Sequence, residues 1–193
     1  MRLFLAIKPD RAAEALLGQA LLRIQSVVGP AAAALKWTPA SNIHATLHFL
    51  GEVNAARTDR LIEIMRPALR EAPFTVSLGG AGAFPPTGGP RVVWLDVTKG
   101  AEGLVNVHAE LGIRLSEAGF AVEPRPFTPH LTVARVRDRD RSQVKGLRER
   151  LTQVQPVDVS WFVDRVLLFR SDLSGAVPRY EDINATPLRA PLQ

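Results

Sequence analysis

The sequence contains the same order of predicted elements twice, and this internal repeat limits the possible folds more than any other feature. Each half alternates segments of period-two hydrophobicity, typical of strands, with segments of helical period. The predicted strands of the two halves cover residues 2–8, 43–50 and 74–80, and then 91–97, 130–136 and 157–163. Both halves therefore have the order β–α–β–α–β. This order predicts an α+β fold of two pseudo-symmetric lobes whose sheets line a central cleft.

The chain length favours a single domain. Its 193 residues are enough for one unit built from two closely packed lobes. We expect one domain over 1–193, with lobe-like halves of about 1–88 and 89–193 that meet in the Pro- and Gly-rich stretch AGAFPPTGGP. Further strands are expected near 166–173 and 180–188. Exchange of terminal strands between the halves remains open at this level.

Composition excludes several classes of protein. The chain contains no cysteine, which excludes disulfides, a thiolate nucleophile and Cys-based metal sites. No apolar run approaches the roughly 18 residues that a membrane-spanning helix needs. We therefore expect a cytoplasmic protein without a membrane partner. The expected oligomeric state is a monomer.

The positive charge is rich in arginine and unevenly distributed. The 24 basic residues exceed the 19 acidic ones, for a net charge of +5. Because the guanidinium group binds phosphate through two parallel hydrogen bonds, this balance favours an anionic partner such as nucleic acid. Residues 135–150 hold most of the excess and carry a helical pattern at Val144, Leu147, Leu151 and Val154. This basic segment is either a track for RNA or a solvated helix face.

Two of the four histidines are followed by a threonine two residues later on corresponding predicted strands: His44 with Thr46, and His130 with Thr132. Period-two alternation places both members of a pair on one face, about 6.6 Å apart along the strand. The repeat then places the two pairs on opposite sides of the cleft. This arrangement suits metal-independent phosphoryl transfer, because one imidazole can accept a proton while the other donates one. The threonine hydroxyls would donate to the phosphate oxygens.

These motifs resemble the 2H phosphoesterase superfamily, and within it the RNA 2′,3′-cyclic phosphodiesterases, also called 2′-5′ RNA ligases. The similar segments cover nearly the whole chain and are RLFLAI, NIHATLHFLGEV, RVVWLDV and RPFTPHLTVARV. The resemblance implies a bilobal fold with antiparallel-rich sheets. It also implies an enzyme that hydrolyses RNA 2′,3′-cyclic phosphodiester ends, or small cyclic nucleotides, to 2′-phosphomonoesters. Neither a metal nor another cofactor is expected.

The resemblance also implies roles for single residues. His44 would donate a proton to the departing 3′ oxygen, and His130 would be the base that activates water. Thr46 and Thr132 would bind the phosphate, which makes the two histidines the catalytic pair and the two threonines substrate ligands.

Two further substrate-binding residues follow from the resemblance: Arg135 as a phosphate clamp and Phe49 as a platform for a nucleobase. Each lies five positions after a motif histidine, which puts it on the opposite face of an ideal strand. A bulge or a strand end must therefore redirect both side chains. The alternative for Phe49 is a core residue that continues the face of Ile43, Ala45 and Leu47, and the alternative for Arg135 is a solvated charge. His48 and His108 are expected to be structural.

Two other functions remain open. The same residues could join a 2′,3′-cyclic RNA end, such as that of a tRNA half, to a 5′-hydroxyl, with a ribose hydroxyl in place of water. Alternatively, the cleft could bind RNA without turnover.

Overall fold

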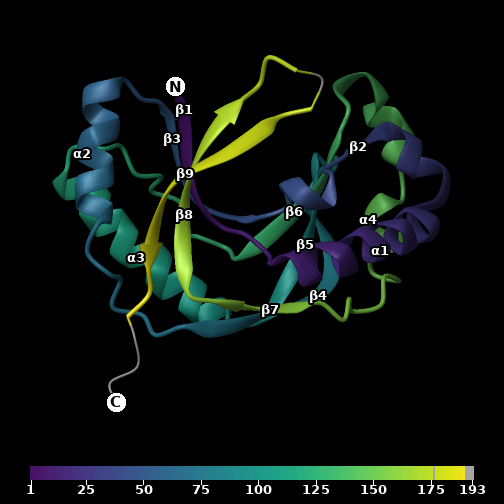
Figure 1. Cartoon of the computed structure of the whole chain (residues 1–193). Helices are drawn as coiled ribbons and strands as arrows, with labels where there is room; N and C mark the ends of the chain where they lie inside the picture. The colour runs from purple at the N-terminus through teal and green to yellow at the C-terminus, as the bar shows by residue number, and fades with distance from the viewer. Residues whose placement is uncertain (176, 190–193) are drawn as a thin grey trace.

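The computed structural model describes residues 1–175 and 177–189 and contains two antiparallel sheets (Figure 1). The strands of the first sheet are β1 (Arg2–Ile7), β3 (Ala45–Glu52), β8 (Arg165–Asp172) and β9 (Arg179–Pro187). The strands of the second sheet are β2 (Leu35–Trp37), β4 (Phe74–Phe84), β5 (Val92–Lys99), β6 (His130–Val136) and β7 (Ser160–Val163). Their orders are β3-β1-β8-β9 and β2-β6-β5-β4-β7, with antiparallel neighbours throughout. The predicted α+β class is confirmed.

The helices of the described residues follow the predicted order. The α-helices are α1 (Arg11–Val28), α2 (Ala55–Met65), α3 (Ala101–Glu117) and α4 (Leu147–Leu151). Short 3-10 helices are η1 (Gly29–Ala34), η2 (Ala40–Asn42) and η3 (Asp138–Val144). The carboxylate of Asp10 caps α1 by accepting the Ala13 N–H at 2.8 Å. Helix α2 ends just before Pro67, which cannot continue a helical hydrogen-bond ladder.

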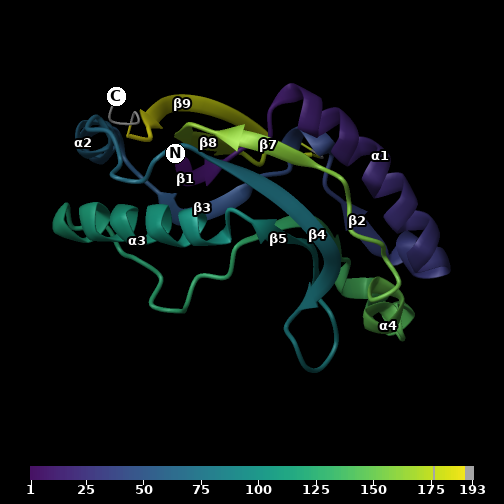
Figure 2. The same cartoon turned by 90° about the horizontal axis from the view of Figure 1, so that it is seen from below.

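Each sheet has its own pair of helices. Helices α2 and α3 pack against the first sheet through β9 and β3, whereas α4 packs against β4 of the second sheet and α1 packs against α4. Figure 2 shows α1 and α4 at one end of the molecule and α2 at the other. The face of the first sheet that carries Phe4, Ala6 and Phe169 holds the site described below.

The two sheets do not correspond to the two sequence halves. The loop between β4 and β5 contains the proposed division near residue 88, and each sheet takes strands from both sides of it. Strand β4, the last of the first half, pairs with β5 of the second half. Conversely, β8 and β9 of the second half belong to the first sheet, where β8 pairs with both β1 and β9. The lobes are therefore interleaved along the chain.

From Leu3 to Ile7, strand β1 is buried on both faces, which explains why these residues are all apolar. Leu3, Leu5 and Ile7 point into the main core. Phe4 and Ala6 point to the other face and form a separate small cluster with Phe169 of β8. This second cluster is the apolar floor of the candidate site.

Two elements differ from the sequence prediction. The basic helix expected over 144–154 is reduced to α4, because Gly146 adopts a left-handed φ of 71° and separates it from η3. Strand β2 was not predicted, since three residues are too few to show a hydrophobic period.

Candidate active site

The two motif histidines occupy corresponding places at the starts of strands in different sheets. His44 directly precedes β3, and His130 is the first residue of β6. In both cases ring atom Nδ1 lies next to the carbonyl oxygen two residues earlier, at 2.8 Å from that of Asn42 and at 2.7 Å from that of Thr128. The two halves of the internal repeat therefore share even this side-chain hydrogen bond.

These hydrogen bonds fix the tautomer of both rings. A carbonyl oxygen only accepts, so Nδ1 must carry the proton and donate it in each histidine. In the neutral ring, Nε2 then holds a lone pair, and in the charged ring it carries a proton. Nε2 of His44 and of His130 makes no hydrogen bond to another described residue. Both rings thus keep Nε2 available for proton transfer.

A β-bulge in β3 redirects Phe49. Leu47 has no partner in the register with β1, and Leu47 and His48 are both buried. At Phe49 the alternation of buried and exposed residues is therefore shifted by one position. Phe49 consequently shares a face with His44 and Thr46 and is 67% exposed. The core alternative for Phe49 is thereby excluded.

A matching bulge in β6 redirects Arg135. Here the register with β5 skips Val133, and both Val133 and Ala134 are buried. Arg135 therefore emerges exposed on the face that carries His130 and Thr132. The redirecting feature that the sequence required is present in both strands, at the same position of the motif.

The two motif threonines are half-buried on these same faces. Neither the Thr46 hydroxyl nor the Thr132 hydroxyl hydrogen-bonds to another described residue. Both can therefore donate to an anion that enters between the strands.

His44 is held in its neutral form in the unliganded protein. Loss of hydration on burial lowers the pKa of His44 to about 4, and the charges of Lys8 and Arg135 act in the same direction. The hydrogen bond to the Asn42 carbonyl only partly opposes this. Because Arg135 belongs to the second sheet, its effect on His44 links the two motifs electrostatically.

Aromatic side chains surround His44. The Phe4 ring lies beneath it with centroids 4.8 Å apart, and the Tyr180 ring meets it edge-on at 5.3 Å. Phe49 lies beside the same floor, 6.2 Å from Phe4. On the other motif, Phe84 meets the His130 ring edge-on at 5.0 Å. Packing thus limits the rotation of both imidazoles.

Sequence reasoning missed a cavity of about 90 Å³ beside His44. Its walls include Lys8, Tyr180 and Asp182, which are distant in sequence. The Asn42 side chain donates to the Pro178 carbonyl at 2.7 Å and so holds the β8–β9 hairpin against this wall. No local pattern identified these residues. The pairing of β1 with β3 brings Lys8 to His44, and the pairing of β9 through β8 brings Tyr180 and Asp182.

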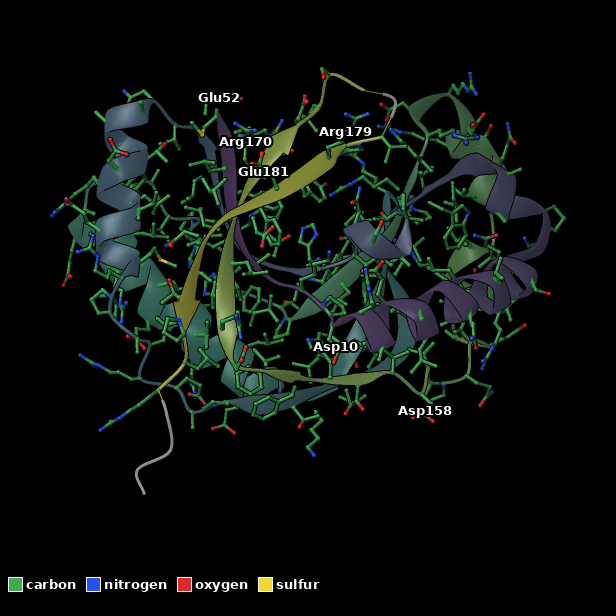
Figure 3. All side chains as sticks on the ribbon, viewed as in Figure 1. Asp10, Glu52, Asp158, Arg170, Arg179 and Glu181 are labelled. Carbon is green, nitrogen blue, oxygen red and sulfur yellow. The ribbon has the colours of Figure 1, made fainter. Side chains whose placement is uncertain are left out.

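On β8 and β9, away from His44, basic and acidic side chains neutralise each other. Figure 3 shows Arg170 and Glu181 side by side on β8 and β9, where they form an ion pair, with Arg179 farther along the hairpin. The charge of Arg170 is therefore compensated locally. Lys8 and Arg135 are the cations whose charge acts on His44.

Several arginines of the basic segment 135–150 hydrogen-bond to the main chain of the protein itself. Arg137 and Arg150 donate to main-chain carbonyls at 2.7 and 3.0 Å, and Arg148 donates to three carbonyls of the 83–88 segment. Two further arginines form ion pairs with nearby aspartates. These bonds favour a structural role for Arg148 and its neighbours over an RNA track.

In the part of the chain that the structure describes, no group of three or more His, Asp or Glu side chains could hold a metal ion. Across residues 1–175 and 177–189, no helix has the length and apolar character needed to span a bilayer.

Comparison with known proteins agrees with this geometry. The model of the 2′-5′ RNA ligase superfamily matches residues 10–175. This chain belongs to that superfamily. The resemblance to 2H phosphoesterases is therefore confirmed, and the matched region contains both His-x-Thr motifs together with Phe49 and Arg135.

Curated relatives are similar to this chain over most of its length. A protein of Methanothermobacter thermautotrophicus named RNA 2′,3′-cyclic phosphodiesterase is 37% identical over 95% of this chain and 96% of its own length. A protein of the same name from Aquifex aeolicus is 31% identical over 75% of this chain and 77% of its own.

Solved structures share the fold over essentially the full length. The protein TT0787 of Thermus thermophilus has a TM-score of 0.76 and 30% identity, with all of both chains covered. Escherichia coli LigT in complex with 3′-AMP has a TM-score of 0.74 and 25% identity, with 97% of each chain covered.

Proposed function

We propose that this protein hydrolyses RNA 2′,3′-cyclic phosphodiester ends to 2′-phosphomonoesters, with two imidazoles as its acid and base. The observation that carries the proposal is the repeated geometry of the His-x-Thr strands. Each has an Nδ1–H bonded to the carbonyl two residues earlier, a free Nε2 and an adjacent bulge. The full-length similarity to a protein named RNA 2′,3′-cyclic phosphodiesterase supports the choice of substrate.

In the proposed reaction, the Nε2 lone pair of His130 takes a proton from water as the water oxygen bonds to phosphorus. The bond from phosphorus to the 3′ oxygen breaks, and its electron pair stays on that oxygen. His44 donates the Nε2 proton that completes the 3′-hydroxyl. The products are a 2′-phosphomonoester and a free 3′-hydroxyl.

Three groups are assigned to the phosphate. The Thr46 and Thr132 hydroxyls donate to its non-bridging oxygens, and the Arg135 guanidinium adds charge-assisted hydrogen bonds. Phe49, exposed beside this face, offers its ring to the nucleobase. The mechanism uses only side chains of the protein and requires no metal ion.

The proposed donor must be protonated when the substrate is bound. In the unliganded protein the pKa of His44 is about 4, so at neutral pH the ring is uncharged. A phosphate anion beside it offsets the charges of Lys8 and Arg135, which raises the proton affinity of Nε2. Binding and protonation are therefore coupled, because the bound phosphate favours uptake of the proton that His44 donates.

The decisive experiment treats an RNA ending in a 2′,3′-cyclic phosphate with purified protein in excess EDTA. We expect a product with a 2′-phosphate and no loss of rate. Activity that disappears in EDTA and returns with zinc, magnesium or manganese would contradict the metal-independent mechanism. A 3′-phosphate product would contradict the assignment of the leaving oxygen.

The family description favours one second function, 2′-5′ ligation. A 5′-hydroxyl could replace water as the group that His130 deprotonates, with His44 unchanged as the acid. Adding an RNA with a 5′-hydroxyl end to the same assay tests this function. Joined product that resists a 3′-5′-specific nuclease at the junction would support it.

A further inference from the structure

Three stacked rings connect β3, the strand of the first His-x-Thr motif, with the segment that precedes β6, the strand of the second motif. The His48 ring of β3 lies 4.1 Å from the His108 ring of α3, with an angle of 14° between their planes. The His108 ring in turn lies 4.3 Å from the Phe127 ring, at 3°. His48 also donates its Nε2–H to the His108 carbonyl at 2.9 Å, which ties the strand to the helix.

The stack consists of uncharged rings at neutral pH. Burial lowers the pKa of His48, and it lowers that of His108 to about 4, with the neighbouring His48 acting in the same direction. Two neutral imidazoles can pack face to face without the repulsion that two charged rings would experience. The expectation of a structural role thus describes His48 and His108 only in part, because the stack ends near the second motif.

Phe127 immediately precedes Thr128, whose carbonyl receives the Nδ1–H of His130. In the described part of the chain, residues 121–128 make no backbone–backbone hydrogen bond. The Thr128 carbonyl is therefore positioned by the chain on its two sides. Strand β6 begins two residues after it, and the stacked Phe127 ring immediately before it is the nearest anchor on the other side.

The corresponding carbonyl beside His44 is held differently. Asn42 belongs to η2, where its N–H donates to the Pro39 carbonyl at 2.8 Å. Its side chain also donates to the Pro178 carbonyl at 2.7 Å. One catalytic ring is thus oriented by a hydrogen-bonded turn and the other by a ring stack.

We propose that His108, held in place by His48, is a positioning residue for His130. The stack fixes Phe127, and Phe127 fixes the carbonyl that holds the His130 ring with Nε2 free. Because His130 is the base of the reaction, the kinetic part of this inference rests on the proposed function. The orientation of the ring does not, since it can be measured without substrate.

The test measures the Nδ1–H protons of His44 and His130 by NMR in protein labelled with ¹⁵N in its histidine rings. In His108→Ala we expect the His130 signal to disappear through exchange with water, while the His44 signal persists. His108→Phe keeps an aromatic ring in the stack and should retain both signals. With a 2′,3′-cyclic mononucleotide, kcat should fall on the order of 10-fold in His108→Ala with KM unchanged, and His108→Phe should stay within about two-fold of wild type.

Two further variants keep the result interpretable. Phe127→Leu retains an apolar side chain but removes the ring, and it should reproduce the selective loss of the His130 signal if His108→Ala fails to fold. Ile113→Ala changes an exposed residue of the same helix and should alter neither signal. Persistence of the His130 signal in His108→Ala, or simultaneous loss of both signals, would overturn the positioning role. If His108→Ala selectively loses the His130 signal but the wild-type protein has no phosphodiesterase activity, the proposed function alone would be refuted.

Discussion

His44 lies where burial and two neighbouring cations determine its proton affinity. Burial removes water from the ring, and Lys8 and Arg135 oppose a positive charge on it, so its pKa is about 4 instead of 6.5. The unfolded chain therefore binds more protons than the folded one between these two pH values, and folding is weakened as the pH falls through that range. We expect a phosphate anion bound beside the ring to have the opposite effect, because it would stabilise the charged form.

The pKa of His44 should rise when a phosphate ligand binds. We expect NMR titration of unliganded protein to give a midpoint near pH 4, and saturation with a nucleoside 2′-monophosphate to raise it by more than about one unit. Arg135→Gln should raise the midpoint of the unliganded protein, since one opposing charge is removed. A midpoint that the ligand leaves unchanged would contradict the coupling of binding to protonation.

Replacing His44 should make folding less sensitive to acid. Between pH 7 and pH 4, the free energy of unfolding should decrease by about 3 kcal/mol more in the wild type than in His44→Gln. His108 contributes with the same sign in both proteins, so the difference isolates His44. Urea unfolding at a series of pH values measures it, and parallel curves would disprove the expected contribution.

The acid and base should be separately indispensable. His44→Ala and His130→Ala should each lower kcat by about 10²-fold or more on a 2′,3′-cyclic mononucleotide, and the wild-type pH profile should be bell-shaped. Phe162→Ala, a change of an exposed residue on β7, serves as the control. A one-sided profile, or a His130→Ala enzyme of near wild-type turnover, would exclude the assigned roles.

At the level of elements, the sequence predicts what repeats locally. Hydrophobic period and the Asp10 cap predict α1, and alternation predicts β3 and β6. The need for a bulge follows from the five-residue offset of Arg135, but its position at Val133 does not, because a bulge is defined by the partner strand. The hydrogen bonds of Arg148 likewise depend on a loop about 60 residues away in sequence. Composition alone made that arginine a candidate for RNA binding.

Substitution of two arginines in the same basic segment should therefore affect different properties, turnover in one case and stability in the other. Arg135→Ala should reduce turnover even of a mononucleotide substrate, because the proposed clamp contacts the reacting phosphate. Arg148→Ala should leave that turnover nearly unchanged and lower the free energy of unfolding by about 1–3 kcal/mol, since three carbonyls lose their donor. Chemical denaturation and steady-state kinetics on both variants distinguish the roles. A stable Arg148→Ala protein with a raised KM only for long RNA would restore the RNA track.

At the level of the whole molecule, the repeat predicts two lobes but not which strands of the chain form each sheet. Alternation identifies β4 and β8 as strands, yet the sheet that each joins depends on pairings between segments far apart in the sequence. The cavity residues Lys8, Tyr180 and Asp182 were missed for the same reason. The motif residues could be predicted because a single short strand presents each pair. The pKa of His44 could not, because it depends on burial and on charges that the folded chain brings together.

The interleaved sheets should make the two sequence halves inseparable. A fragment of residues 1–88 lacks the partners of β4, and a fragment of residues 89–193 lacks β1, the partner of β8. We expect neither fragment alone to show cooperative unfolding by circular dichroism, and co-expression of both to restore the fold and the activity. A fragment that unfolds cooperatively by itself would show that one lobe is an independent unit.

The hydrogen bond from each histidine Nδ1 to the carbonyl two residues earlier has a consequence for how such a site can arise. In a Ser-His-Asp triad the orienting group comes from a distant part of the chain and must be acquired separately. Here the orienting group is part of the same short segment as the imidazole. Duplication of one stretch of coding sequence would therefore supply a second correctly oriented imidazole at once. Only the support behind each carbonyl, a turn in one lobe and a ring stack in the other, would remain to diverge.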